Sequence, residues 1–301
     1  MPQLGEEVAA ALARGAAVVA LESTIIAHGL PRPRNLEVAG RLEDAVRAAG
    51  AVPATIAVLD GVPVVGVDRA ALEILAAGDG VAKLSARDLP LAAATRTTGA
   101  TTVAATAHLA ARAGIRVFAT GGLGGVHRGA AESWDESADL LALAVTPITV
   151  VAAGVKSILD VGATLERLES LGVSVAGWRT SRFPGFYLAD GGFDLDWALD
   201  GPEQAASAMA AADALGVRSA LVVANPIAAD RELDRAEHDR ALAEGLALAA
   251  EQGVRGKAVT PFLLAHLHEA TAGRSLDVNV EVALGNAGVA GAIAAAWAAR
   301  A

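Results

Sequence analysis

Short runs of small and β-branched apolar residues recur along the chain, and most are followed by a segment with helical spacing. The runs lie at residues 17–21, 54–59, 62–67, 115–119, 148–152 and 220–224, and the helical patterns at 36–49, 101–113, 157–171, 202–215 and 231–252. Such uninterrupted runs are typical of strands buried on both faces. Their alternation with helices predicts an α/β protein, and we expect a three-layer α/β/α sandwich with a mixed, mostly parallel sheet.

The spacing of these runs also predicts how the chain is organised. Asp60-Gly61 separates two runs and is a hairpin signal, so we expect some antiparallel pairing. The sequence contains no internal repeat, linker-like segment or charge block that would divide it. We therefore predict a single domain over residues 1–301, long enough to bury a large core.

Charge and composition exclude several classes of protein. A net charge of -10 and ten aromatic residues leave no basic surface for phosphate backbones and few rings for base stacking, so we expect no nucleic-acid partner. Because the chain has no cysteine, disulfides and thiolate chemistry are excluded and any metal must bind oxygen or imidazole.

Neither end of the chain has the pattern of a membrane segment. Residues 1–20 contain Glu6, Glu7 and Arg14, which argues against a signal sequence or a spanning helix. The least charged long window, 282–299, is rich in small residues and contains Asn286, so we interpret it as a helix packed in a core or an oligomer. We expect a soluble, cytoplasmic protein without a membrane partner.

Polar residues and glycines follow the predicted strands. Glu22-Ser23-Thr24 follows the first run, the glycine-rich segment 120–127 follows the fourth, residues 154–157 follow the fifth, and Asn225-Pro226 follows the last. Open α/β sheets bind ligands at the carboxyl ends of their strands. These segments are therefore the predicted ligand site.

Lysine is rare in this chain: three lysines, Lys83, Lys156 and Lys257, stand beside 21 arginines. A chain that meets its need for surface charge with arginine keeps lysine where arginine cannot substitute, for example as an amine that loses its proton and attacks a carbonyl. Lys156 is the best placed, because it follows a buried run and precedes the predicted helix. The alternatives are a lysine that snorkels from a helix start and a chance retention.

Glu22 is the second candidate for chemistry. A carboxyl group at the end of a buried strand is partly desolvated and could stay protonated, as a general acid needs. The alternatives are a salt bridge with Arg32 or Arg34, and an acid in solvent.

Residues 132–139 contain four acidic side chains. Asp135 and Asp139 are four residues apart and would share a helix face, where one or both could hold a hard divalent cation. The alternative is helix capping, because Ser133 with Glu136 fits a capping box.

The glycine-rich segment could cradle a phosphate through backbone N–H groups, with His127 and Arg128 adding charge. Its spacing does not fit a dinucleotide fingerprint, and Gly256-Lys257 does not fit a Walker motif. The threonines at 97–102 offer further donors, or simply cap a helix. We interpret His28, His108, His266 and His268 as structural because none has metal-ligand spacing.

A set of longer motifs resembles one known family, the pseudouridine-5′-phosphate glycosidases. The resemblance runs from about residue 22 to the C-terminus and rests on LESTIIAHGLP (21–31), KLSARD (83–88), GATTV (99–103), ATGGLGGVHRG (119–129), SADL (137–140), GVKSILD (154–160) and FPGF (183–186). So many motifs in one order make it specific.

The resemblance implies a role for each matched residue. Lys156 would form an imine with C1′ of the ribose and Glu22 would be the proton donor. Substrate contacts would come from Lys83, Val103, Thr120, His127, Ser137, Ala138, Asp139 and Asn279, and Asp135 would hold one Mn²⁺ ion per subunit directly or through water. The family is a homotrimeric α/β/α sandwich that reversibly converts pseudouridine 5′-phosphate and water to uracil and ribose 5-phosphate.

The chemistry of that substrate gives a reason for a lysine. Uracil is joined to the sugar through carbon, and uracil C5 is a poor leaving group, so cleavage needs C5 protonated and a place for positive charge on the sugar. An iminium on opened ribose supplies that place, which a second carboxylate would not.

Two other functions remain open from the sequence. A different lysine-imine lyase acting on a phosphorylated sugar would keep Lys156 and the anion-binding loop but not the uracil contacts. A sugar-phosphate binding module without catalysis would form no covalent adduct, and the presence of both Lys156 and Glu22 argues against it.

Overall fold

The computed structural model describes residues 1–254 and 259–300, so Lys257 lies outside the described residues. The strands in the described part form an 11-stranded sheet in which β1-β4-β3-β2-β7-β8-β13-β9-β12 are successive neighbours, with β6 also pairing with β3 and β5. Their bounds are β1 (Gln3–Leu4), β2 (Val18–Leu21), β3 (Val52–Leu59), β4 (Val62–Val65), β5 (Ala82–Leu84), β6 (Gly99–Thr101), β7 (Val117–Ala119), β8 (Thr149–Ala152), β9 (Ser174–Trp178), β12 (Ala198–Leu199) and β13 (Leu221–Ala224). A separate ribbon pairs β10 (Arg182–Phe183) with β11 (Phe193–Asp194).

The sheet is mixed and mostly parallel, as predicted. Strands β3, β2, β7, β8, β13, β9 and β12 pair in parallel along the middle and one side of the sheet. The antiparallel pairs are β3 with β4 and β3 with β6. At the predicted β3–β4 hairpin, Asp60 and Gly61 both have positive φ, 48° and 80°, which fits a turn with the twist of a two-residue hairpin.

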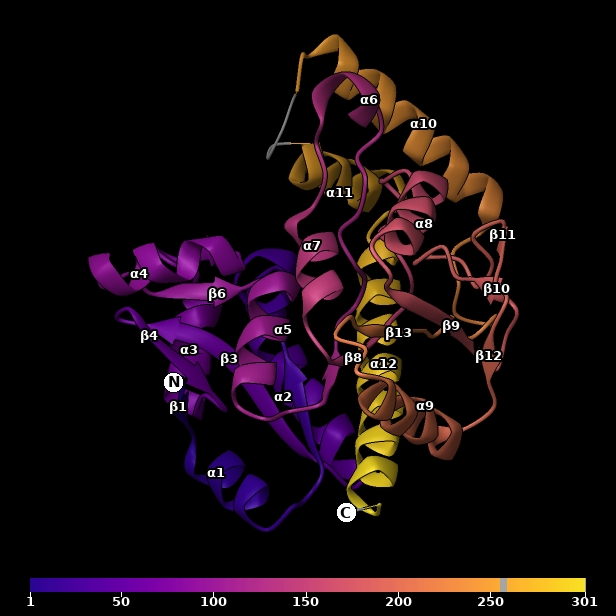
Figure 1. Cartoon of the computed structure of the whole chain (residues 1–301). Helices are drawn as coiled ribbons and strands as arrows, with labels where there is room; N and C mark the ends of the chain where they lie inside the picture. Colours follow the sequence, from indigo (N-terminus) through magenta and orange to yellow (C-terminus); the bar gives the residue numbers. More distant parts are fainter. Residues whose placement is uncertain (255–258, 301) are drawn as a thin grey trace.

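Helices cover both faces of the sheet (Figure 1). One face packs against α1 (Glu6–Ala13), α4 (Leu89–Thr95), α5 (Val103–Arg112), α7 (Ala138–Val145) and α8 (Val161–Ser170), and the other against α2 (Arg34–Ala48), α9 (Pro202–Leu215) and α12 (Arg274–Ala298). Along β2, Val18 and Ala20 point into the first core while Val19 and Leu21 point into the second. The three-layer prediction is therefore confirmed.

The remaining helices lie around these layers. They are a π-helical turn η1 (Ile25–Gly29), α3 (Arg69–Ala77), a 3₁₀ turn η2 (Ala86–Asp88), α6 (Ala130–Ser133), α10 (Arg235–Glu251) and α11 (Val259–Ala270). Figure 1 shows α6 and α10 at the same end of the molecule, beyond the sheet.

Helix α12 is long and apolar enough to cross a membrane by length and composition, yet half of its most apolar window is buried inside the protein. Val280, Ala287 and Ile293 belong to the core beneath the sheet, and the helix packs on α2 and α9 (Figure 1). In the described structure α12 is therefore a core helix, as its small residues predicted.

The element boundaries differ from the sequence prediction in instructive places. The predicted helix at 157–171 begins only at Val161, because the preceding residues form a turn and Asp160 caps the helix by accepting from the Ala163 N–H. The predicted helix at 101–113 begins at Val103, because residues 99–101 pair with β3 and β5. The first shift lengthens the loop between β8 and α8, whereas the second leaves only Thr102 between β6 and α5.

The packing of α12 on α2 generates a stability prediction. A Cβ atom added at Gly291 would lie 2.5 Å from Cβ of Ala49 and 3.2 Å from the carbonyl oxygen of Val46, whereas one added at Gly288 meets nothing within 4 Å. We expect Gly291→Ala to lower the free energy of unfolding by about 1–3 kcal/mol through overpacking. Gly288→Ala, the matched control, should raise it by about 0.5–1 kcal/mol through helix propensity. Urea unfolding measures both, and equal stability of the two variants would contradict this packing.

Candidate active site

The parallel pairing of β2, β7 and β8 places the predicted site residues at one edge of the sheet. Leu21 pairs with Ala119 and Ala119 with Val151, so these strands end side by side. Glu22 follows β2, Thr120 follows β7, and the segment leading to Lys156 follows β8. The sequence prediction that these segments meet is confirmed for the described residues.

Glu22 accepts hydrogen bonds from two hydroxyl groups. Thr24 Oγ1 and Thr120 Oγ1 each donate to a different oxygen of its carboxylate. The alternative of a salt bridge with Arg32 or Arg34 is wrong, because Arg32 pairs with Asp79 at 3.2 Å and Arg34 with Asp277 at 2.6 Å. Glu22 is therefore held by neutral groups that can either donate or accept a hydrogen bond.

A buried amide network fixes the backbone that carries Thr120. The fully buried Asn286 of α12 donates from Nδ2 to the carbonyl oxygens of Thr120 (2.7 Å) and Gly121 (3.1 Å). Its Oδ1 accepts from Asn225 Nδ2 at 2.9 Å. Helix α12 thus positions the end of β7 and with it Thr120, which donates a hydrogen bond to Glu22.

The pKa of Lys83 is affected by three other charged residues of the candidate site. Desolvation lowers the pKa of Lys83, and the positive charge of Lys156 lowers it further, while the carboxylates of Glu22 and Asp139 act in the opposite direction. Lys83 is exposed to solvent, yet the protein atoms around it still lower its pKa. Two lysines and two acids from four separate segments therefore share one electrostatic environment.

Asp139 joins two helix N-termini. It is buried, its Oδ1 accepts from the Ala104 N–H at the start of α5 (3.0 Å), and its Oδ2 accepts from the Gly124 N–H (2.9 Å). Ser137 caps α7 by accepting from the Asp139 N–H. The predicted substrate residues Val103, Ser137, Ala138 and Asp139 therefore lie around one buried carboxylate, close to N–H groups that can bind an anion.

The glycine-rich segment packs closely against this group. A Cβ at Gly124 would lie 2.2 Å from Ser137 Oγ, and one at Gly122 would lie 2.5 Å from the Phe186 ring. Asn279 of α12 stands beside the same segment, its Oδ1 3.4 Å from the position of a Cβ on Gly121. Glycine is needed here because the backbone approaches its neighbours too closely for a side chain.

Asp135 and His127 form a separate pair on the loop that precedes α7. Asp135 Oδ2 lies 3.8 Å from His127 Nδ1, and the His127 N–H donates to the Asp135 carbonyl oxygen at 3.0 Å. The prediction that Asp135 shares a helix face with Asp139 is wrong, because α7 begins at Ala138. The Ser133–Glu136 capping box is also wrong, since Ser133 ends α6 and Ser137 is the cap.

The donor set at Asp135 fits a cation that keeps most of its water. Among the described residues no group of three or more His, Asp or Glu side chains converges to hold a metal. The Asp135 carboxylate can supply one protein ligand, with His127 beside it. Mg²⁺ and Mn²⁺ sites that keep several waters use few protein ligands of this kind.

Sequence reasoning missed the contacts that hold the site from outside, although Asn225 lies in a predicted ligand segment and Asn286 in the predicted core helix. Asn286, Asn225 and His238 contact site segments from α12, the β13 end and α10, and none of them belongs to a motif with a spacing rule. The available signal was polarity in an apolar context: Asn286 is the only amide in the small-residue window 282–299.

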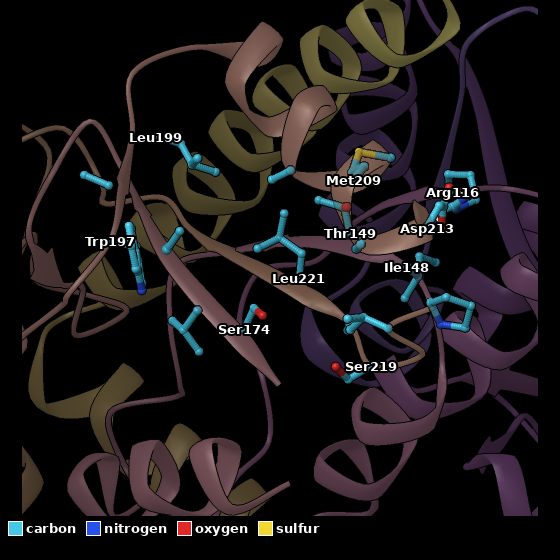
Figure 2. Close-up of a pocket in the computed structure, with 18 residues that line it drawn as sticks. Arg116, Ile148, Thr149, Ser174, Trp197, Leu199, Met209, Asp213, Ser219 and Leu221 are labelled. Atoms are coloured by element: carbon cyan, nitrogen blue, oxygen red, sulfur yellow. Dashed lines mark hydrogen bonds and ion pairs between the residues drawn. The ribbon is translucent and has the colours of Figure 1, made fainter. Parts of the chain in front are cut away.

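A cavity of about 280 Å³ lies elsewhere, at the amino-terminal ends of β8, β9 and β13 and beneath α9 (Figure 2). Arg116 and Asp213 lie toward one end of it and Trp197 toward the other. None of the predicted site residues lines this cavity. We therefore place the candidate active site at the opposite, carboxyl-terminal ends of the strands.

Comparison with known proteins gives consistent matches. The family model described as indigoidine synthase A like protein matches residues 7–296. The pseudouridine-5′-phosphate glycosidases of Salinispora tropica and Frankia alni are 67% and 64% identical, covering 98% and 96% of this chain and 92% and 80% of their own length.

Solved structures agree with the sequence matches. The prealnumycin C-glycosynthase AlnA, in complex with ribulose 5-phosphate, superposes with a TM-score of 0.93 at 39% identity, covering 100% of this chain and 98% of its own. An indigoidine synthase A-like protein from Thermotoga maritima gives 0.88 at 35% identity, covering 98% and 96%.

The shared electrostatic environment can be tested by titrating the lysines. After reductive ¹³C-methylation, the Lys83 signal is identified by its loss in Lys83→Arg and followed by NMR against pH. We expect Lys156→Met to raise the pKa of Lys83, because it removes a positive charge, and Glu22→Gln to lower it, because it removes a negative one.

Asp44→Asn is the control, since Asp44 lies on the exposed side of α2 and is not among the charges that act on Lys83. A Lys83 titration that is the same in Lys156→Met and in the unsubstituted chain would contradict the arrangement.

Proposed function

The chain belongs to the pseudouridine-5′-phosphate glycosidase (indigoidine synthase A-like) family, and from that premise we propose that it cleaves the carbon–carbon glycosidic bond of pseudouridine 5′-phosphate through an imine on Lys156. The observation that carries the proposal is the convergence of Lys83, Lys156, Glu22 and Asp139 in one environment at the carboxyl ends of β2, β7 and β8. The products would be uracil and ribose 5-phosphate, and the reaction would be reversible.

The region around Asp139 is suited to the phosphate of the substrate. The N-termini of α5 and α7 meet there, Lys83 adds positive charge, and the buried Thr102 Oγ1 at the start of α5 has no hydrogen-bond partner among the described residues. Helix N-termini and a lysine are a common phosphate-binding combination. A related C-glycosynthase holds ribulose 5-phosphate, which supports a phosphorylated pentose as the sugar. We propose that Val103, Ser137, Ala138 and Asp139 line this end of the site.

We assign the nucleophile to Lys156 and the phosphate contact to Lys83. The charge of Lys156 acts on Lys83, which supports placing both amines in one site, and the lowered pKa of Lys83 would also suit a nucleophile. However, a phosphate dianion bound at the two helix N-termini would favour the charged form of Lys83. Lys156 follows β8 in the middle of the sheet and is left as the amine that can attack carbon.

Glu22 is placed to supply the proton to the base. It is half-buried, and its carboxylate oxygens are bound by hydroxyls that can reverse their role when the acid is protonated. We propose that Thr120 and Asn279, with His127, contact the substrate on this side. Asn279 would offer an amide, which can both donate to and accept from the polar edge of uracil.

The steps balance as follows. The unprotonated Lys156 amine attacks C1′, the C1′–O4′ bond breaks, and O4′ takes the proton that the amine loses. Protonated Glu22 then gives its proton to uracil C5. The C1′–C5 bond breaks with its electrons returning to the pyrimidine, while the nitrogen lone pair forms the C=N bond of an iminium. Water adds to the iminium, ribose 5-phosphate leaves as the open aldehyde, and Lys156 and Glu22 regain their starting protons.

We propose that Asp135 holds one Mn²⁺ ion per subunit, directly or through water, with His127 beside it. When bound, the cation would supply positive charge at the anionic end of the substrate. The residues of the chain themselves bind the ribose phosphate, orient C1′ toward Lys156 and hold the proton on Glu22.

The assembly and location follow from the family resemblance. We propose a homotrimer in the cytoplasm, acting on small molecules. The chain would act as one domain, since strands from β1 near the amino terminus to β13 share one 11-stranded sheet on which α12 packs.

A first test separates the two catalytic roles. We expect the unsubstituted chain to release uracil from pseudouridine 5′-phosphate. Lys156→Ala should lose the borohydride-trapped adduct with ribose 5-phosphate, detected by intact mass. Glu22→Ala should keep that adduct but lose turnover by at least about 10²-fold, because a positioned acid contributes that much.

Normal turnover in Glu22→Ala would show that its assigned role is wrong. Adduct formation that persists in Lys156→Ala and disappears in Lys83→Arg would move the nucleophile to Lys83.

A second test addresses the metal. Chelation should lower uracil release by the unsubstituted chain, and added Mn²⁺ should restore it. Asp135→Asn should need a higher Mn²⁺ concentration for the same rate, with adduct trapping on Lys156 retained. Glu132→Gln, a neighbouring exposed acid, is the control. Chelator-insensitive turnover of protein shown to be metal-free would contradict the proposal.

A further inference from the structure

A buried hydrogen-bonded chain leads from the residue after Lys156 to the surface. Ser157 Oγ lies 2.9 Å from His238 Nε2, and His238 Nδ1 lies 2.9 Å from Asp239 Oδ1. Ser157 and His238 are 6% and 4% exposed, whereas the Asp239 side chain is 61% exposed. None of these three residues has a part in the steps given above.

The donors and acceptors of this chain can be assigned from its chemistry. A carboxylate oxygen accepts hydrogen bonds, so we assign the tautomer in which His238 Nδ1–H donates to Asp239 Oδ1. In this tautomer Nε2 is an acceptor, and the Ser157 hydroxyl donates to it.

The order serine, histidine, aspartate is also that of a hydrolase triad. Ser157 is buried in the core, and its backbone belongs to the turn that begins at Lys156. Its hydroxyl is therefore better placed to hold this turn than to attack a substrate.

The turn itself is bound on its other side by the glycine-rich segment. The Lys156 N–H donates to the Leu123 carbonyl oxygen at 3.2 Å, and the Asp160 N–H donates to that of Val126 at 2.9 Å. Arg128 donates from Nη2 to the Ser157 carbonyl oxygen at 3.4 Å and from Nε to that of Ile158 at 3.3 Å. His238 contacts the turn from α10, a different element, through the Ser157 side chain.

We propose that His238 is a positioning residue for Lys156: bound to Asp239, it anchors Ser157 and so fixes the turn from which the lysine reaches C1′. Helix α10, in which Asp234 caps the first turn by accepting from the Glu237 N–H at 2.9 Å, carries the anchor. A lysine has a long flexible stem, so the direction of its backbone limits where the amine can go. Misplacing a reacting group by about 1 Å can cost about 10²-fold in rate. The inference rests on the proposed function of Lys156.

The test uses His238→Leu and Ser157→Ala, which remove the two partners of one hydrogen bond. Each should slow both kcat for uracil release and the rate of borohydride-trapped adduct formation by about 10- to 10²-fold, with KM changed less than about twofold, because the phosphate and base contacts remain. The double variant should be no slower than the worse single variant, since the residues act through the same contact.

His238→Gln should restore most of the rate, because its side-chain amide can place an acceptor near the position of imidazole Nε2. His108→Gln, an exposed histidine on α5, is the matched control and should keep the unsubstituted rate. Circular dichroism and thermal unfolding report folding. If His238→Leu does not fold, Ser157→Ala and His238→Gln carry the test.

Adduct formation at the unsubstituted rate in Ser157→Ala and in the folded His238 variants would overturn the inference while leaving the proposed function intact. Multiplying effects in the double variant would also overturn it, because independent roles multiply. An unsubstituted chain that releases no uracil and forms no adduct would overturn the proposed function, and this inference with it.

Discussion

The parallel pairing of β2, β7 and β8 is the constraint on which the rest of the site depends. Because these strands run in one direction and end in register, Glu22, Thr120 and the segment leading to Lys156 emerge at the same edge of the sheet. Helices on both faces bury the strands, so the edge is rigid and the reactive residues begin from fixed backbone positions.

Electrostatic interactions then affect the pKa of the lysine at this edge of the sheet, Lys83. Desolvation and the positive charge of Lys156 lower the pKa of Lys83, and the carboxylates of Glu22 and Asp139 act in the opposite direction. Both carboxylate oxygens of Asp139 accept hydrogen bonds from backbone N–H groups, and these bonds connect α5 to the glycine-rich segment. In the proposed site, Lys83 and the starts of α5 and α7 would bind the phosphate, and Glu22 is an acid that two hydroxyls hold.

The sequence was sufficient to predict the layers and six of the thirteen strands in the described residues, because buried parallel strands leave continuous apolar runs. It did not predict that Asp135 and Asp139 lie on different elements, since a helix start inside an acidic segment depends on the Ser137 cap. Strand β9 was also missed, because Ser174 and Gly177 weaken its apolar pattern. The contacts of Asn286 and His238 could not be predicted, because their partners are 166 and 81 residues away in the sequence, although the polarity of Asn286 in an apolar window was a signal.

A crystal structure of the protein soaked with ribose 5-phosphate tests the central claim most directly. Continuous electron density from Nζ of Lys156 to C1′ of an open-chain sugar, with the phosphate near Lys83 and the start of α5, is the expected result. Density that joins the sugar to Lys83, or a closed ribose far from both amines, would contradict the assignment.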